Sequence, residues 1–260
     1  MGAILKKDIM GLTVFFRQSS SDEAVLNHSF DSEIYFPQLP EFDFANAKSI
    51  IDIGGHIGAF SIYTSIKCPN AKIFTLEPNE ESFSILKLNK EENDLTNIFI
   101  YKTAVTSKRD KVKLYLDKEN WGHSTSMMIS NNFEIVDSQD LISFALNHNI
   151  SEIDLIKFNC EGAEFEIINS LTPEFMGRIK TMIILYHEDL TKNSRYDKGW
   201  LLNQLHKNGF FCRLYARNNK RGCIIAVHKT YKGIQLPLKK RLKLFARKII
   251  CIMRYLFQVW

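Results

Sequence analysis

The stretch that decides the fold is Ser49-Ile-Ile-Asp-Ile-Gly-Gly-His-Ile-Gly-Ala-Phe60. Ile50, Ile51 and Ile53 form a short β-branched run, which is typical of a strand buried on both faces of a parallel sheet. Three glycines come next, and the apolar spacing after them predicts a helix that begins at the glycines. Because glycine lets the backbone approach a ligand and a helix start has unpaired N–H groups, this arrangement predicts a nucleotide site.

The spacing of the glycines separates two cofactor classes. A dinucleotide fingerprint is Gly-x-Gly-x-x-Gly, whereas this turn is Asp52-x-Gly54-x-x-x-Gly58. The next apolar run, 71–76, ends in Glu77-Pro78-Asn79, so a second strand would bring a carboxylate to the same sheet edge, where it can accept both ribose hydroxyls. The alternative is that the glycines serve only the geometry of a tight turn.

A glycine turn followed by such an acid resembles the cofactor site of S-adenosylmethionine-dependent methyltransferases. This resemblance implies cofactor contacts from the turn and from the ends of the second and third strands. The expected cofactor-binding residues are Asp52, Gly54, Gly55, His56, Gly58, Glu77, Pro78, Asn79 and Ala104.

Length and composition indicate a globular protein in a reducing compartment. The 260 residues, 45% hydrophobic and 24% charged, are enough for one α/β domain with extensions. The five cysteines are far apart without Cys-x-x-Cys spacing, so neither a metal site nor a disulfide framework is expected. No apolar segment follows a basic start, so no signal peptide is expected and the cytoplasm is the predicted location.

The pattern along the chain predicts a class I methyltransferase fold of the Rossmann-like type. We expect an N-terminal cover (1–48), a methyltransferase domain (49–236) and a helical tail (237–260). A mostly parallel, seven-stranded α/β sheet should end in an antiparallel hairpin, because two β-rich runs are joined by Asn218-Asn-Lys-Arg-Gly222. Strands are predicted at 11–16, 50–53, 71–76, 98–101, 111–116, 153–158, 180–186, 210–217 and 222–228. Helices are predicted after the serines at 19–21, after Asn79, after Ser138, from about 164 to 171 and from about 196 to 208.

Four motifs in order resemble the FkbM-type methyltransferase family. They are Ile-Asp-Ile-Gly-Gly-His-Ile-Gly-Ala-Phe (51–60), Leu-Glu-Pro-Asn (76–79), Thr-Ala-Val (103–105) and Asp-Leu-Ile-Lys-Phe-Asn-Cys-Glu-Gly-Ala-Glu (154–164). The entry segment from Arg17 to Asp22, with Tyr35, is also similar, and the likeness covers about 17–188. It implies an S-adenosylmethionine-dependent O-methyltransferase of a carbohydrate or lipid-linked surface glycan, in polysaccharide biosynthesis.

Two positions depart from the family pattern and remove carboxylates near the expected reaction site. Asn159 stands where the family usually has aspartate, and Leu185 where a glutamate often precedes Tyr or His on the fifth strand. These departures support an alternative function, in which the protein is a cofactor-binding scaffold without catalysis. A methyltransferase acting on another small molecule is a further alternative.

The catalytic candidates lie at the predicted strand ends. Methyl transfer is an in-line displacement that depends mainly on orientation, and a positioned base adds to it. Glu161 and His187 are the predicted catalytic residues, ranked equally, and His56 is a further candidate. Each has a structural alternative: Glu161 can cap a helix, His187 can be a packed core residue and His56 can merely occupy the turn.

The expected partner is a small-molecule or glycan acceptor. Nucleic acid is not expected, because the chain lacks an Asn/Asp-Pro-Pro-aromatic element for a flipped base and its basic charge lies in one tail. The loop 116–129, with Trp121-Gly-His-Ser-Thr-Ser-Met-Met128, is either a lid or substrate wall or a surface excursion. The oligomeric state stays open.

The tail carries the excess positive charge. Residues 237–260 contain seven Lys or Arg residues and no acid, while the whole chain has a net charge of +5. As a helix, the tail has one apolar stripe, which predicts contact with an anionic membrane surface such as the inner face of the cell membrane. The alternative is packing on the domain or on a second subunit. The stripe comprises Leu238, Leu242, Phe245, Ile249, Ile252, Met253, Leu256 and Trp260.

Overall fold

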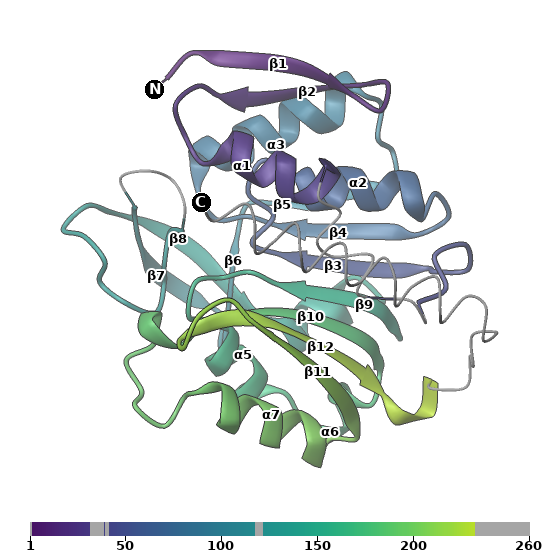
Figure 1. The fold of residues 1–260 in the computed structure, drawn as a ribbon, viewed down its shortest axis with the longest axis vertical. Coiled ribbons are helices and arrows are strands. Elements are labelled where there is room, and N and C mark those ends of the chain that lie inside the picture. Colours follow the sequence, from purple (N-terminus) through teal and green to yellow (C-terminus); the bar gives the residue numbers. More distant parts are fainter. Residues whose placement is uncertain (1, 32–38, 40–41, 118–121, 232–260) are drawn as a thin grey trace.

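The computed structural model describes residues 2–31, 39, 42–117 and 122–231, and a seven-stranded sheet forms its centre (Figure 1). The strand order is β11-β12-β10-β9-β3-β4-β5. The bounds are β3 (Ser49–Ile53), β4 (Lys72–Leu76), β5 (Ile98–Tyr101), β9 (Ile153–Phe158), β10 (Ile179–His187), β11 (Phe210–Ala216) and β12 (Arg221–His228).

Strand directions confirm the predicted fold class. β3 pairs in parallel with β4 and β9, and β9 pairs in parallel with β10. β12 runs antiparallel to both of its neighbours, β10 and β11. The sheet is therefore mostly parallel and ends in the antiparallel hairpin that the sequence predicts. Each predicted strand of this sheet is found within two residues of its expected ends.

Helices cover both faces of the sheet (Figure 1). On one side lie α2 (Ala59–Lys67) and α3 (Glu80–Glu92), and on the other lie α4 (Leu141–Asn147), α5 (Glu164–Ser170), α6 (Pro173–Met176) and α7 (Lys198–Lys207). Two apolar clusters fill the space between helices and sheet, one on each face. Burial on both faces explains why the central strands lack a polar alternation.

An N-terminal hairpin covers the α3 side of the molecule. It consists of β1 (Ile4–Ile9) and β2 (Leu12–Arg17), and α1 (Asp22–Leu26) and the π-helical turn η1 (Asn27–Asp31) follow. The side chains of Asn89 and Asn93 on α3 bond to the backbone of β2. The sequence predicts β2 but not β1, because five of the six β1 side chains are exposed. Of the serines expected to cap α1, Ser21 is the N-cap residue but makes no capping side-chain bond, whereas Ser20 Oγ accepts the N–H of Asp22 at 3.2 Å.

A second sheet of three strands lies beside the first. It comprises β6 (Ala104–Thr106), β8 (Phe133–Asp140) and β7 (Asp110–Tyr115), in that order. The prediction that Ser138 caps a helix is wrong, because Ser138 belongs to β8. Asp140 caps α4 instead, with its Oδ1 accepting from the Ser143 N–H at 2.8 Å. The sequence does not predict β8, because its side chains are mostly polar and half exposed.

The predicted tail helix, 237–260, lies outside the described residues. Within the described part of the chain, no helix has the length and apolar character needed to cross a membrane. The remaining elements are two short 3-10 turns, η3 (Glu188–Leu190) and η4 (Lys229–Tyr231).

Candidate active site

The glycine turn after β3 is fixed between the ends of two neighbouring strands. Gly54 has φ +76°, and a Cβ at this position would lie 1.9 Å from the carbonyl oxygen of Asn159. Gly58 has φ +90° and forms the N-cap of α2. The N–H groups of Gly54 and Gly55 both donate to the carbonyl of Leu76, at 3.0 and 3.1 Å. Only glycine fits at position 54, because both the left-handed backbone and the close contact exclude a side chain there.

Glu77 lies at the end of β4, beside the turn. Its carboxylate is 7% exposed and accepts the N–H of His56 at 2.8 Å and the N–H of Asn79 at 2.9 Å. Burial raises the pKa of Glu77 to about 7, although the two N–H groups act in the opposite direction. Each carboxylate oxygen retains a lone pair that can accept a further hydrogen bond. The position therefore fits the predicted role of Glu77 toward the two hydroxyls of a ribose.

A buried ion pair supports the turn from behind. Lys157 Nζ lies 2.7 Å from Asp52 Oδ1, and their side chains are 4% and 0% exposed. Asp52 Oδ2 also accepts from Ser61 Oγ at 2.7 Å, and Lys157 donates to the carbonyl of Gly54 at 3.2 Å. Lys157 is not among the site residues that the sequence predicts. The available signal was a lysine between Ile156 and Phe158 in a strand expected to be buried, where an unpaired charge would be costly.

A cavity of about 530 Å³ runs along the carboxyl ends of the strands. This volume is within the usual range for sites that bind small molecules. Its lining includes the apolar side chains of Pro78, Val105, Leu114 and Ile129. Eight of the predicted site residues line the cavity: Gly54, Gly55, His56, Glu77, Pro78, Ala104, Glu161 and His187. The predicted contacts Asp52, Gly58 and Asn79 do not line the cavity. Each of them supports another residue that does line it.

The second half of the cavity holds a histidine between two carboxylates. His187 Nε2 lies 3.4 Å from Glu161 Oε2, and His187 Nδ1 lies 3.2 Å from Glu164 Oε1. Glu164 is fully buried, and it also accepts the N–H groups of His187 at 2.7 Å and Gly162 at 2.9 Å. Glu164 stands in the Glu-Gly-Ala-Glu motif, but the sequence analysis gave it no role. The fold brings together Glu161 and His187, which are 26 positions apart in the sequence.

The electrostatics of this group separate the roles of its members. Burial alone would lower the pKa of His187, but Glu161 and Glu164 raise it to about 9. Burial also raises the pKa of Glu161 above its usual value, while His187 acts in the opposite direction. His187 is therefore a cation at neutral pH and cannot accept a proton. Glu161 is the group of the pair that can act as a base.

The backbone and a neighbouring loop hold Glu161 in place. Its φ of 49° lies in the left-handed region, which residues with a Cβ rarely adopt. α5 begins after Ala163, so Glu161 does not cap this helix. Ser124 Oγ donates to the Glu161 carbonyl at 2.7 Å, and a Cβ on Gly122 would lie 2.5 Å from the Glu161 carboxyl carbon. The described part of the loop 116–129 is thus a wall of the site.

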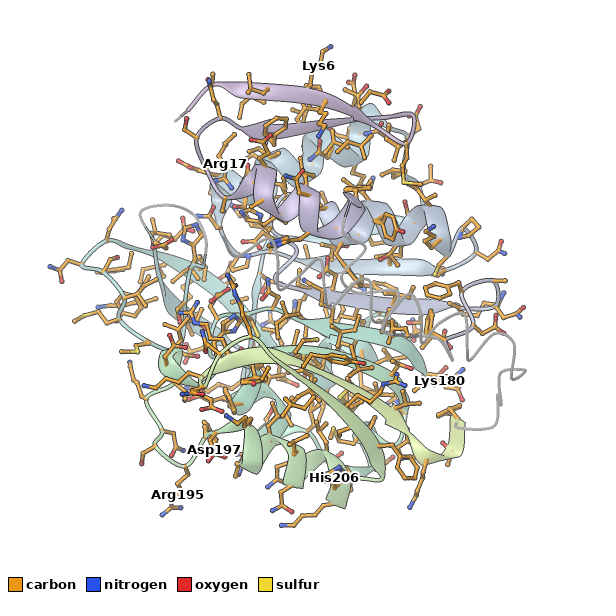
Figure 2. The ribbon with its side chains drawn as sticks, viewed as in Figure 1. Lys6, Arg17, Lys180, Arg195, Asp197 and His206 are labelled. Carbon is orange, nitrogen blue, oxygen red and sulfur yellow. The ribbon has the colours of Figure 1, made fainter. Side chains whose placement is uncertain are left out.

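A polar network closes the site on the side of the N-terminal cover. Arg17, at the end of β2 (Figure 2), is 3% exposed and forms two side-chain hydrogen bonds with Asp22, at 2.9 and 2.8 Å. Its Nη2 also lies 3.1 Å from His56 Nε2. The Arg17 to Asp22 entry segment is therefore in contact with the glycine turn. Tyr35 lies outside the described residues.

The two positions that depart from the family pattern both line the cavity. Asn159 follows β9 and Leu185 is on β10. In this chain the carboxylates near the reaction site come instead from Glu161 and Glu164. Across the described residues, no group of three or more His, Cys, Asp or Glu side chains is placed to hold a metal ion.

Curated relatives of the chain are methyltransferases of fungi. The chain is 22% identical over 162 residues to "Methyltransferase 1" of Beauveria bassiana (strain ARSEF 2860), which covers 54% of this chain and 65% of that protein. It is 24% identical over 178 residues to "Methyltransferase sdnD" of Sordaria araneosa, covering 55% of this chain and 69% of that protein. The chain thus spans about two thirds of the length of these relatives.

Similar solved structures include a methyltransferase and a protein in complex with AdoMet. One is TYW2 of M. jannaschii in complex with AdoMet, with a TM-score of 0.46 and 13% identity over 87% of this chain and 86% of that chain. Another is the precorrin-6y C5,15-methyltransferase of Geobacter metallireducens GS-15, with a TM-score of 0.46 and 14% identity over 76% and 88% of the two chains.

The decisive comparison is with protein families. The description "Methyltransferase FkbM domain" matches residues 52–212, from the glycine turn to β11. This range is more than half of the chain and contains both the glycine turn and the Glu161 motif. The predicted family and its methyl donor are therefore confirmed: the chain belongs to the FkbM family of S-adenosylmethionine-dependent methyltransferases.

Proposed function

We propose that the protein transfers a methyl group to a hydroxyl of a carbohydrate or a lipid-linked glycan. The observation that carries this proposal is the position of the Glu161 carboxylate, in the same cavity as the glycine turn and Glu77. An alcohol needs a base as it becomes methylated, and a carboxylate with a raised pKa is suited to that task. Acceptor and donor would therefore meet between the turn and Glu161.

The glycine turn, Glu77 and Glu161 have separate roles in the proposed reaction. S-adenosylmethionine supplies an electrophilic methyl group on a sulfonium. The glycine turn and Glu77 orient this group, and Glu161 receives the proton of the acceptor hydroxyl as the oxygen–carbon bond forms. The carbon–sulfur bond breaks at the same time, and its electron pair stays on sulfur. Holding the three reacting atoms in line provides much of the acceleration.

His187 has a supporting role in this proposal. As a cation between Glu161 and Glu164, it stabilises the ionised form of Glu161 and fixes the direction of that carboxylate. Glu164 in turn holds the histidine through both its ring and its backbone N–H. His187 is then a positioning residue, whereas Glu161 is the catalytic base. This assignment replaces the equal ranking that the sequence allowed.

A turnover assay tests the proposed function. The full chain is incubated with S-adenosylmethionine and a panel of sugars, nucleotide sugars and glycan extracts, and formation of S-adenosylhomocysteine is measured. Turnover that requires a hydroxylated sugar and is lost in Glu161→Gln supports the proposal. Turnover only with acceptors that lack a sugar, or turnover that persists in Glu161→Gln, contradicts it.

The second candidate is a cofactor-binding scaffold without catalysis. The specific observation in its favour is that Asn159 and Leu185 line the cavity where the family usually has carboxylates. If this candidate is correct, the protein binds S-adenosylhomocysteine but forms none from S-adenosylmethionine, even with cell extract as the source of acceptor. Restoring the family residue through Asn159→Asp would then be the next experiment.

The basic tail suggests that the protein binds its acceptor at a membrane surface. Residues 237–260 lie outside the described part of the chain, so the proposal rests on the sequence pattern alone. A basic amphipathic helix binds peripherally to anionic membranes, where lipid-linked glycans are found. Flotation with anionic and neutral liposomes tests this, with a version that ends at Leu236 as control. Salt-sensitive binding that the truncation removes supports the proposal, and truncation that instead disrupts a dimer contradicts it.

A further inference from the structure

Two histidines line the cavity with a ring nitrogen that has no hydrogen-bond partner among the residues that the structure describes. They are His56, in the glycine turn, and His123, in the loop after β7. The unpaired atoms are His56 Nδ1 and His123 Nε2, and both are shielded from solvent. Buried polar atoms are nearly always paired, so two unpaired nitrogens in one cavity indicate a ligand group. The rings are close enough for His123 to affect the pKa of His56.

The neighbours of His123 identify its unpaired nitrogen as a donor. The backbone N–H of Asp117 donates to His123 Nδ1 at 3.0 Å. A backbone N–H cannot accept, so Nδ1 carries no proton. Burial lowers the pKa of His123, and the ring is therefore neutral at pH 7. Its one proton is on Nε2, the atom without a partner.

The neighbours of His56 lead to the same result. Arg17 Nη2 lies 3.1 Å from His56 Nε2, and a guanidinium only donates. Asp22 Oδ1 is 3.3 Å from the same nitrogen but already accepts from Arg17 at 2.8 Å. Burial lowers the pKa of His56 to about 4, although Asp22 acts in the opposite direction. The proton of this neutral ring is then on Nδ1, which makes it a second unpaired donor.

We propose that the N–H groups of His56 and His123 together bind the α-carboxylate of the methionine half of S-adenosylmethionine. His56 adjoins the ribose position, because its backbone N–H donates to Glu77. The methionine half must extend from there over the glycine turn, since the methyl group has to reach Glu161. Arg17 is a positioning residue that sets the tautomer of His56. The inference rests on the proposed cofactor site and adds the residues that recognise its charged end.

Charge also favours an anionic group at this place. Both Arg17 and Lys157 lower the pKa of His56, which shows that each contributes a positive potential there. Two of the acidic side chains nearby are engaged with Arg17: Asp22 through two hydrogen bonds, and Glu81 with its Oε2 at 3.6 Å from Arg17 Nη1. A third, Asp117, lines the cavity and raises the pKa of His123, against the effect of Arg17. The two ring N–H groups are thus left for an acceptor supplied by the ligand.

Calorimetry with two ligands tests this inference. The first ligand is S-adenosylhomocysteine, and the second is its decarboxylated analogue, which keeps the adenosine, thioether and amine. Hydrogen bonds to a charged group are stronger than neutral ones, so the wild-type chain should prefer the first ligand by about ten- to a hundredfold. His123→Phe should weaken the first ligand about tenfold and leave the second unchanged. His206→Phe, an exposed position on α7 far from Arg17 (Figure 2), is the matched control and should change neither affinity.

The outcomes separate this inference from the proposed function. Equal affinity of the wild-type chain for the two ligands, or an equal loss for both in His123→Phe, overturns the carboxylate site but leaves the methyl donor in place. Failure of the wild-type chain to bind either ligand overturns the cofactor site and this inference with it. If His123→Phe does not fold, the wild-type comparison still decides. In addition, imidazole ¹⁵N spectra should show His123 as the Nε2–H form, with a shift only on addition of the carboxylate-bearing ligand.

Discussion

Two buried groups of opposite charges lie at neighbouring strand ends, and they behave differently. Behind the glycine turn, Lys157 and Asp52 form a pair at 2.7 Å with almost no exposure. On the acceptor side, His187 lies between Glu161 and Glu164 at 3.4 and 3.2 Å, and Glu161 retains 13% exposure. The first pair combines a lysine with a fully buried carboxylate and fixes the turn. The second contains a histidine that can lose its proton and a carboxylate that reaches the cavity.

The comparison shows that the residues that hold the glycine turn are different from those proposed to take part in proton transfer. Asp52 does not line the cavity and Lys157 lines it with a side chain that is only 4% exposed, whereas the side chains of His187 and Glu161 line it with 10% and 13% exposure.

Glu161→Gln should lower turnover by about 10²–10⁴-fold, because the amide cannot accept the acceptor proton. Affinity for S-adenosylmethionine should stay within about twofold, which calorimetry measures. Glu166→Gln, an exposed carboxylate on the following helix, is the control and should leave turnover unchanged. A variant that lost cofactor affinity as much as turnover would place Glu161 in the supporting group instead.

Lys157→Met should lower the free energy of unfolding by about 3–5 kcal/mol, because it leaves the Asp52 carboxylate buried without its cation. The double variant Asp52→Asn with Lys157→Met should lose less, since no charge is then left unpaired. Urea unfolding of four proteins provides the comparison: the wild-type chain, Lys157→Met, Asp52→Asn and the double variant. A double variant that is less stable than both single variants would show that the pair does not act as one unit.

Raising the pH should weaken the group of charges around His187. The pKa of His187 is raised to about 9 from an ordinary value of 6.5, so its contribution to stability is complete below pH 6.5. That contribution declines as pH rises and is lost above about pH 9, and it amounts to about 3 kcal/mol. Unfolding measured from pH 6 to 9.5 should therefore show a decline that His187→Gln lacks. The same slope in both proteins would mean that another group titrates.

Glu77→Ala should weaken S-adenosylmethionine binding by about 1–3 kcal/mol, because the ribose hydroxyls lose their acceptor. Burial raises the pKa of Glu77 to about 7, and donation from a ribose favours the ionised form. Binding should therefore release a proton near neutral pH, and affinity should fall as pH drops below 7. Calorimetry in buffers of different ionisation enthalpy measures the released proton. Unchanged affinity in Glu77→Ala would remove Glu77 from the cofactor site.

The sequence predicted the main sheet because its signals are local. The run at Ile50 to Ile53, the glycines that follow and the hairpin at 218–222 each depend on residues next to one another. It failed for β1, whose side chains are largely exposed, and for β8, whose side chains are mostly polar and half exposed. The three-stranded sheet with β6 and β7 was therefore not foreseen.

The sequence by itself determined the family, the turn and the identity of the acids at the strand ends, because these depend on residue types at short fixed spacings. Only the tertiary structure decided what each acid does. It buried Asp52 against Lys157, directed Glu77 to two backbone N–H groups and placed His187 between Glu161 and Glu164. The physical reason is that pKa and role depend on burial and on partners distant in sequence, and folding alone brings those together.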